Sequence, residues 1–378
     1  MYKFENLIEE VKELNTELKY GLDDIVGVTI EKGLIPTVAN LTQTALDKFY
    51  IVKPETFIYN PRTHGVRLGM GYNETSDTYI TSWNNVAFRV KETAQNIVLP
   101  QYLWLYFCRP IWDRITNFLA WGSSTIVFAW KDFLNIDIDL PSIEKQREIV
   151  EEYETLSRRI RLNEQMIEKL EATAQSLYRK MFVDGIDKEN LPEGWRMGFL
   201  TDVATYLNGI ACQKYETSES DFLPVLKIRE LTQGHCDSNS DHVSLDIPND
   251  YIIDDGDVIF SWSATLFIDI WCGGKSALNQ HLFKVSSERF PRWFVFLWTL
   301  YHIDEWKRLI SAKATSMGHI KREDLESAEV VIPSKTSLIE MNSYFEPLFE
   351  LYTLKKKESL KLSELQSLLL AKMGNLKQ

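Results

Sequence analysis

Apolar residues recur along residues 149–181 with alternating steps of four and three, which is the heptad period of a coiled coil. The period persists for more than four heptads, so a coiled-coil helix is favoured over the alternative, a core helix of a bundle. Asn163 is the lone polar member of the seam, and such a residue often fixes helix register at some cost in stability. The predicted seam consists of Ile149, Tyr153, Leu156, Ile160, Asn163, Ile167, Leu170, Ala174, Leu177 and Met181.

Two further helices are predicted at the ends of the chain. Residues 334–378 are rich in leucine, but their apolar positions wrap around the helix. A helix that is apolar on more than one face is usually covered by more than one neighbour. One neighbour could be the first long helix, and another a separate protein. At the N-terminus a short seam predicts one more helix of the same bundle, with the members Phe4, Leu7, Val11, Leu14 and Leu18.

The chain contains an internal repeat. A shift of 192 positions places Pro141 on Pro333, Tyr153 on Phe345 and Met181 on Met373 without a gap. At slightly different shifts, three upstream stretches also match later ones: 55–60 resembles 256–261, 84–90 resembles 279–285, and 99–107 resembles 290–298. Because the matches keep the same order, we interpret the chain as a tandem duplication of a globular domain followed by a long helix.

This repeat predicts a domain layout and a fold class. The expected segments are an N-terminal helix (1–20), a globular domain (21–140), a long helix (141–189), a second globular domain (190–333) and a second long helix (334–378). Each globular half combines short strands, separated by turn residues such as Asp-Gly, with a helix after Pro100 or Pro291. The predicted class is α+β, with two tandem α/β domains that are each followed by a long α-helix.

Composition and charge narrow the possible settings of the protein. The chain has 378 residues, of which 44% are hydrophobic, which is ample for two cores. Its four cysteines lack metal or disulfide spacing, its N-terminus lacks a signal peptide, and its most apolar run (290–303) is too short to span a membrane. A cytoplasmic protein with free thiols is therefore expected. The net charge of −12 argues against a simple nucleic-acid binder, so partners would have to supply part of any phosphate neutralisation.

The sequence does not support the interpretation that this protein is an enzyme. The stretch CGGKS (272–276) ends like a phosphate-binding loop, but Asp269 occupies the position of the required first glycine. The stretch YNPRT (59–63) resembles an amino-methyltransferase motif, but Arg62 replaces its second proline. The six histidines lack ligand spacing, and the acidic stretch 254–257 is interpreted as a solvated turn rather than a cation site. We therefore predict no catalytic constellation and no metal site.

Several stretches together resemble one family. They are LPSIEKQREIVEEYETLSRRI (140–160), LPEGWRMGFLTDVA (191–204), PVLKIREL (224–231), GDVIFSWS (256–263) and ALNQHLFKV (277–285). In this combination and order they resemble the specificity (S) subunit of type I restriction–modification systems. The resemblance implies two target-recognition domains and two long helices that pair as an antiparallel coiled coil with pseudo-two-fold symmetry. In the first half, ITSWNNVAFRV (80–90) matches ALNQHLFKV only loosely.

The same resemblance implies a function. Such a subunit reads a bipartite double-stranded DNA sequence, with one half-site for each globular domain. It binds two methyltransferase (M) subunits, and motor-nuclease (R) subunits join them for cleavage. S-adenosylmethionine, ATP and Mg are then expected only in the partner subunits. The acidic balance of the chain fits basic partners that complete the clamp around DNA.

Residues that could read bases follow from base-edge chemistry, in which Arg or Lys pairs with guanine and Asn or Gln with adenine. In the first half the candidates are Asn60, Arg62, His64, Arg67, Asn84, Asn85, Ser123 and Ser124. In the second half they are Lys227, Arg229, Ser261, Trp262, Ser263, Asn279, Gln280, His281, Thr315 and Ser316. The alternative for each is a surface or capping role. Arg62 and Arg67 are the preferred readers, whereas Trp83 and Trp262 are expected to pack in the core.

Two other classes of function stay open at this point. A coiled-coil adaptor that binds only proteins would share the long helices but show no selectivity for DNA sequence. A self-contained methyltransferase or nuclease would need motifs that we do not find. The leading interpretation is a non-catalytic DNA-specificity subunit that also acts as a scaffold.

Overall fold

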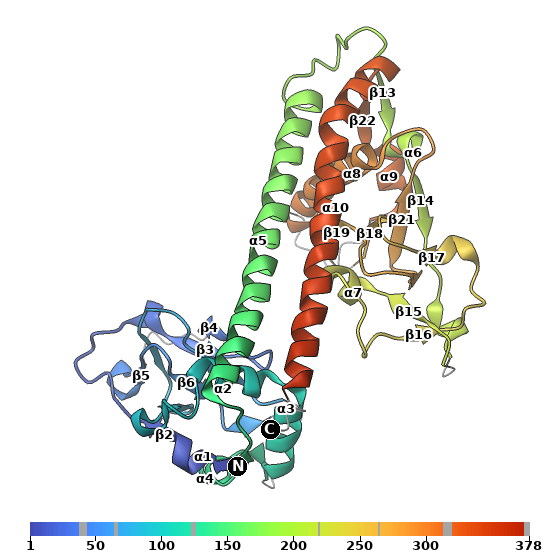
Figure 1. Cartoon of the computed structure of the whole chain (residues 1–378). Helices are drawn as coiled ribbons and strands as arrows, with labels where there is room; N and C mark the ends of the chain where they lie inside the picture. Colours follow the sequence, from blue (N-terminus) through green and yellow to red (C-terminus); the bar gives the residue numbers. More distant parts are fainter. Residues whose placement is uncertain are drawn as a thin grey trace. The chain divides into compact units, whose positions relative to one another are not determined.

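The computed structural model describes residues 1–37, 44–63, 67–121, 126–217, 220–263, 265–312 and 320–373, with backbone only at 309–312. The chain forms two compact units (Figure 1). The first contains Met1–Arg158 with Glu364–Gln378, and the second contains Arg159–Ser363. Each unit thus includes one globular domain and a part of both long helices.

The first unit is built on a four-stranded antiparallel sheet. Its strands follow the order β2 (Ile8–Val11), β10 (Val86–Val90), β6 (Phe57–Tyr59) and β8 (Met70–Tyr72). Helices α2 (Pro100–Cys108), α3 (Pro110–Leu119) and α4 (Trp130–Leu134) supply aromatic residues to the same core. The ring centroids of Phe57 and Phe88 lie 5.0 Å apart on neighbouring strands, and Phe107 of α2 contacts both rings edge-on. Strand pairs around this sheet are β1 (Tyr2–Lys3) with β12 (Asp137–Ile138), β3 (Val26–Val28) with β4 (Leu34–Pro36), β5 (Tyr50–Val52) with β9 (Tyr79–Thr81), and β7 (Arg62–Thr63) with β11 (Ile126–Val127).

The second unit contains a sheet of the same kind. Its strands follow the order β14 (Thr205–Asn208), β21 (Leu282–Ser286), β18 (Val258–Ser261) and β19 (Phe267–Ile270). A second sheet follows the order β16 (His242–Val243), β15 (Leu223–Leu226), β20 (Ser276–Leu278) and β17 (Ile252–Ile253). Strands β13 (Arg196–Phe199) and β22 (Glu329–Ile332) form a separate pair. The helices of this domain are α6 (Leu200–Val203), α7 (Ile228–Gln233), α8 (Arg292–Ala312) and α9 (Arg322–Ser327).

The strand pairing confirms the duplication and corrects one of its alignments. In each main sheet the strand that comes first in the chain, β2 or β14, lies at one edge, and a hairpin, β6–β8 or β18–β19, lies at the other. With 55–60 matched to 256–261, Phe57 corresponds to Val258. Their partners across the sheet, Phe88 and Val285, then correspond as well. The sequence match of 84–90 with 279–285 had instead placed Phe88 on Phe283, so that match is displaced by two residues.

The predicted N-terminal helix over residues 1–20 is wrong. Only Phe4–Leu7 (α1) is helical, and β1 and β2 flank this single turn. Strand β2 pairs with β10 at the edge of the main sheet, and Phe4 and Leu7 are fully buried in the core of the first unit. The spacing of three and four that suggested a helix therefore reflects burial in a mixed sheet and helix core. Residues 1–20 belong to the first globular domain.

The two long helices begin through the same local chemistry. Helix α5 runs over Ile143–Phe182 and α10 over Lys335–Lys372. Before α5, the Ser142 hydroxyl accepts a hydrogen bond from the Lys145 amide (3.3 Å), and before α10 the Ser334 hydroxyl accepts one from the Ser337 amide (3.2 Å). Both serines satisfy backbone N–H groups that a helix start leaves without partners. The repeated Pro-Ser join is therefore a repeated N-cap.

Within each unit the long helices pack antiparallel, as predicted. In the first unit Gln366 donates to the Ser157 hydroxyl (2.6 Å), and Ile149 and Met373 share one core. In the second, Arg159 pairs with Glu358 (2.6 Å). Further along α5 in the same unit, Ala174 lines the same small cavity as Phe349 of α10.

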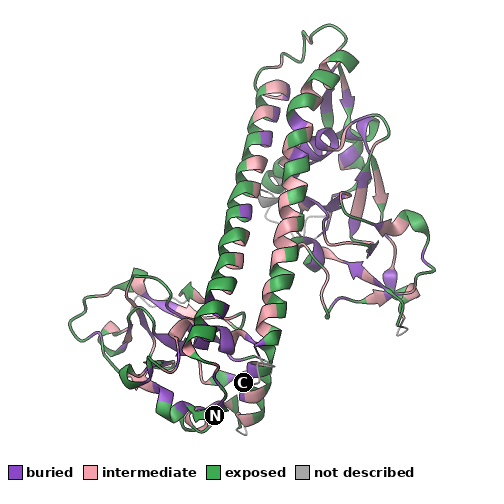
Figure 2. Cartoon of the chain, viewed as in Figure 1, coloured by how far each residue is buried: buried purple, intermediate pink, exposed green. Residues whose placement is uncertain are grey.

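The predicted heptad seam is turned inward at every position. Ile149, Asn163 and Ala174 are buried, and the other seam residues are half-buried, whereas most positions between them along the middle of α5 are exposed (Figure 2). The Asn163 side-chain N–H group is buried without a hydrogen-bond partner among the described residues. No helix in the described ranges is long and apolar enough to cross a membrane.

Candidate nucleic-acid interface

In the first unit, the loop between β6 and β8 presents two arginines. The Asn60 amide donates to the Gly69 carbonyl (2.9 Å) and closes the loop. The Asn60 side chain accepts a hydrogen bond from the Arg62 amide (3.0 Å), so Asn60 shapes the turn. Arg62 and Arg67 are exposed, and neither pairs with a carboxylate of any described residue. His64 lies outside the described residues.

The final segment of the first domain lies against this loop. Strand β11 pairs with β7, so that Val127 lies opposite Arg62, and Trp121 forms a bridge to Val127 from the other side. The Phe128 amide donates to the Pro61 carbonyl (2.8 Å). Trp121 is 75% exposed and lies across Val127 from Arg62, and the sequence analysis did not select it. Ser123 and Ser124 lie outside the described residues.

The turn before β10 contains one exposed and one structural asparagine. The Asn85 side-chain NH₂ group donates to the Thr81 hydroxyl (2.8 Å), which donates in turn to the Val26 carbonyl (3.0 Å). Asn85 thus holds the turn, whereas Asn84 is exposed. Trp83 is exposed as well, with its ring 5.5 Å from the buried ring of Phe49. The expectation that Trp83 packs in the core is therefore wrong.

The second unit has an equivalent loop after β18. The Ser261 hydroxyl is buried and donates to the Ser263 carbonyl (3.3 Å). The Ile320 amide donates to the Trp262 carbonyl (3.1 Å), which repeats the bond between Phe128 and Pro61 in the first unit. The Trp262 ring N–H donates to the Asn208 side chain (3.1 Å), and the ring packs against Phe283. Trp262 therefore has the packing role expected for it.

Next to this loop, His281 is exposed and held in one orientation. Its Nδ1 forms a hydrogen bond with the Ser263 hydroxyl (3.3 Å), and its amide donates to the Asn279 side chain (3.3 Å). Ser263 and Asn279 are buried. Gln280, which is half-buried, and His281 are therefore the two polar side chains of this turn that reach solvent, while Ser263 and Asn279 position them.

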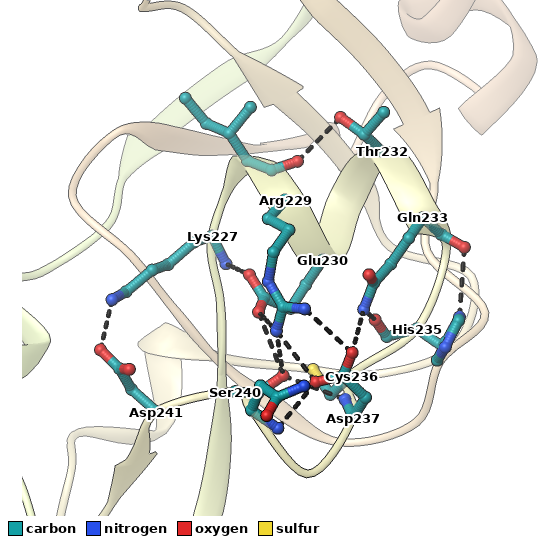
Figure 3. A network of polar contacts seen from close by, with 12 residues as sticks. Lys227, Arg229, Glu230, Thr232, Gln233, His235, Cys236, Asp237, Ser240 and Asp241 are labelled. Atoms are coloured by element: carbon teal, nitrogen blue, oxygen red, sulfur yellow. Dashed lines mark hydrogen bonds and ion pairs between the residues drawn. The ribbon is translucent and has the colours of Figure 1, made fainter. Parts of the chain in front are cut away.

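Lys227 and Arg229 belong to a network of polar contacts within the second domain (Figure 3). The Arg229 guanidinium makes two hydrogen bonds to Asp237 (2.9 and 3.0 Å) and one to the buried Glu230 (2.5 Å). These contacts hold the pKa of Asp237 well below its usual range and raise the pKa of Arg229. The Lys227 ammonium forms an ion pair with Asp241, and the Lys227 backbone amide donates a hydrogen bond to the Glu230 carboxylate (3.2 Å). The structure therefore commits both cations to anchoring α7, with acidic partners that no motif revealed.

A cleft of about 770 Å³ adjoins the loop of the second unit. Asn208, Trp262, Lys321 and Arg322 line it. Arg322 pairs with Glu326 (3.1 Å), whereas Lys321 makes no ion pair with any described residue. The candidates Thr315 and Ser316 lie outside the described residues. Lys321 is thus a cation beside the loop that the sequence analysis did not select.

Two of the three aspartates in the acidic turn of the second unit form ion pairs with lysines of the same unit. Lys284 pairs with Asp257 (2.8 Å), and Lys357 of α10 pairs with Asp255 (2.9 Å). Among the described residues, no group of three His, Cys, Asp or Glu side chains could hold a metal ion. The turn thus joins the second domain to its long helix.

Two stretches of the chain, residues 13–172 and 192–364, match the family described as type I restriction modification DNA specificity domain. The chain belongs to this family. Each match spans one globular domain and most of the long helix after it, so the family unit and the internal repeat coincide. The resemblance to type I specificity subunits and the fold class, both predicted from the sequence, are thereby confirmed.

Individual relatives agree with this family of DNA specificity subunits. The type I restriction enzyme MjaIX specificity subunit of Methanocaldococcus jannaschii is 24% identical over 297 residues, which are 73% of this chain and 68% of that protein. The crystal structure of the type I restriction–modification S subunit from M. genitalium is 14% identical, covers 98% of this chain and 94% of that one, and has a TM-score of 0.54. At this identity the likeness shows the fold.

Proposed function

We propose that this specificity subunit reads a bipartite double-stranded DNA target, with one half-site for each unit. The observation that carries the proposal is the pair of equivalent loops, after β6 and after β18. Both are braced by the same backbone bond from the segment that follows the domain's helices, at Phe128 and at Ile320. Both present polar side chains that reach solvent, namely Arg62 and Arg67 in one and His281 with Gln280 beside the other.

The proposal also covers partners and cofactors. Two M subunits would bind along the long helices, and R subunits would join the complex for cleavage. Helix α10 leaves apolar side chains exposed, Tyr344, Leu351 and Leu354 in the second unit and Leu365 and Leu368 in the first, and exposed apolar residues in such number favour a protein partner. In this proposal the chain works in the cytoplasm without catalysis of its own, and S-adenosylmethionine, ATP and Mg act in the M and R subunits.

The reconstituted complex should therefore select two conserved base blocks from a pool of randomised duplexes. Arg62→Ala or Arg67→Ala should relax the preference at one or two base pairs of a single block, by on the order of 1–3 kcal/mol, because a bidentate arginine contact to guanine is lost. The readout is sequencing of bound duplexes at two salt concentrations.

A matched control separates base reading from charge. Arg89→Ala removes an exposed arginine from the same unit, but this residue pairs with Glu9 (2.8 Å) on the main sheet. It should leave both blocks unchanged. Retention of random duplexes without any conserved block would contradict the proposal and favour the protein-only adaptor.

A further inference from the structure

A buried ion pair lies directly behind the first reading loop. Lys32, in the turn between β3 and β4, pairs with Asp113 of α3. Their side chains are only 7% and 15% exposed. Burial also raises the pKa of the nearby Cys108 thiol to about 12, although the Lys32 charge opposes the shift. The pair therefore lies in a poorly solvated place, where a charge without its partner would be costly.

Both members of the pair bind the backbone of the same loop residue. The Lys32 ammonium donates to the Leu68 carbonyl (2.7 Å), and the Asp113 carboxylate accepts a hydrogen bond from the Leu68 amide (3.3 Å). Leu68 is buried and follows Arg67 directly. The two backbone groups that set the direction of the chain at Leu68 are thus held by one ion pair.

The turn that carries Lys32 is itself constrained. Lys32 has a φ of 65°, a left-handed conformation that residues other than glycine seldom adopt. The Thr29 carbonyl of this turn accepts hydrogen bonds from the amides of Lys32 (3.3 Å) and Met70 (3.2 Å). At Gly71 a Cβ atom would lie 2.4 Å from the Leu34 side chain and 3.2 Å from the Gly33 backbone, so the end of this turn packs closely on the strand that leaves the loop. Strain of this kind persists where the surrounding structure enforces it, often at a functional site.

We propose that Lys32 and Asp113 are positioning residues for DNA recognition by the first unit. They fix the backbone at Leu68, and with it the direction in which the neighbouring Arg67 leaves the surface. Buried ion pairs contribute little net stability compared with apolar residues of similar volume, but they can enforce one specific conformation. This inference rests on the proposed function, because a reading loop must present its arginines in one geometry to contact base edges.

The test uses a charge-free variant of similar volume, Lys32→Met with Asp113→Asn, in the full chain with its M subunits. Two quantities are measured: hydrogen exchange of peptides spanning residues 60–69, and the base preference selected from randomised duplexes. We expect at least tenfold faster exchange in the loop. We also expect at least fivefold weaker preference at the base pairs that Arg62→Ala and Arg67→Ala affect, with the other half-site unchanged.

The control is Val98→Ala, which opens a cavity in the core of the same unit at a fully buried residue. It should lower stability and leave the first half-site intact. Unchanged loop exchange in the charge-free variant would overturn the inference, and so would faster exchange with full preference, or an equal loss of preference in Val98→Ala. Failure of the proposed function would appear instead in the unmodified protein, as the absence of any selected half-site.

Discussion

Lys356→Met is expected to lower the free energy of unfolding of the second unit by on the order of 3–5 kcal/mol, because it leaves a buried carboxylate without its cation. At roughly 2–4 °C for each kcal/mol in a domain of this size, the transition should fall by roughly 6–20 °C. Calorimetry of the full chain, in which the two units can unfold separately, measures this shift.

The contacts of Lys356 explain the size of the effect. Its ammonium pairs with Asp269 on β19, the edge strand of the main sheet, and donates to the Ile270 carbonyl (3.0 Å). The Tyr352 hydroxyl donates to the other Asp269 oxygen (2.9 Å). The side chains of Lys356 and Asp269 are 14% and 12% exposed. This group therefore fastens the second domain to α10 in an environment that water hardly screens.

Two variants separate the buried charge from other effects of the substitution. Lys357→Met removes the adjacent lysine, whose pair with Asp255 has side chains 44% and 30% exposed, and should cost less than about 1 kcal/mol. Lys356→Met combined with Asp269→Asn should recover most of the loss, since no buried charge remains unpaired. Equal losses for Lys356→Met and Lys357→Met would show that burial of this pair does not matter.

Lengthening the paired helices by one turn should lengthen the preferred DNA spacer. Helix α5 has 40 residues, or about 60 Å at 1.5 Å per residue. Four residues inserted between Arg161 and Gln165, together with four between Glu358 and Leu362 of α10, keep the two helices matched. The insertion adds about 6 Å, close to two base-pair steps of roughly 3.4 Å, and rotates the helix by only about 40°. We expect both half-sites to be retained with a spacer longer by one or two base pairs.

A two-residue insertion at the same places is the control. It adds about 3 Å but rotates the helix by about 200°, so the two readers could no longer face one DNA duplex, and binding should be lost. Selection of bound duplexes with randomised spacer lengths measures both variants. If the four-residue variant keeps the original spacer, the helices connect the readers but do not set the distance between them.

The first long helix could be predicted from the sequence because its heptad period extends over many turns, and the second because the internal repeat aligns it with the first. The N-terminal seam was too short for such a prediction: Phe4 and Leu7 have helical spacing, yet the chain continues into β2 after one turn. The repeat was visible as well, but its register near β10 was displaced by two residues. A displacement of two keeps every side chain on the same face of a strand, so the hydrophobic pattern could not reveal it.

The candidate site was harder to predict because the hydrogen-bond partners of a side chain depend on the fold. Arg229 has the chemistry of a base reader, but its guanidinium binds the adjacent Glu230 and Asp237, which is eight positions further along the chain. Lys32 and Asp113 are 81 positions apart and belong to no motif. Arg62 lies near the segment after α3 because β7 pairs with β11, a pairing of strands that are far apart in the sequence. The sequence thus indicated candidate loops, whereas the availability of their side chains depends on contacts that only the fold shows.

The pseudo-two-fold relation between the halves and the bipartite target stay predictions. Replacing one domain by that of a relative tests the bipartite target most directly. The first domain should be replaced as residues 1–140, not 21–140, because β2, Phe4 and Leu7 are part of its sheet and core. In a chimera with the corresponding domain of a relative, duplex selection by the reconstituted complex should yield one new half-site and one unchanged half-site. A chimera that changes both half-sites, or neither, would contradict the account of two independent readers.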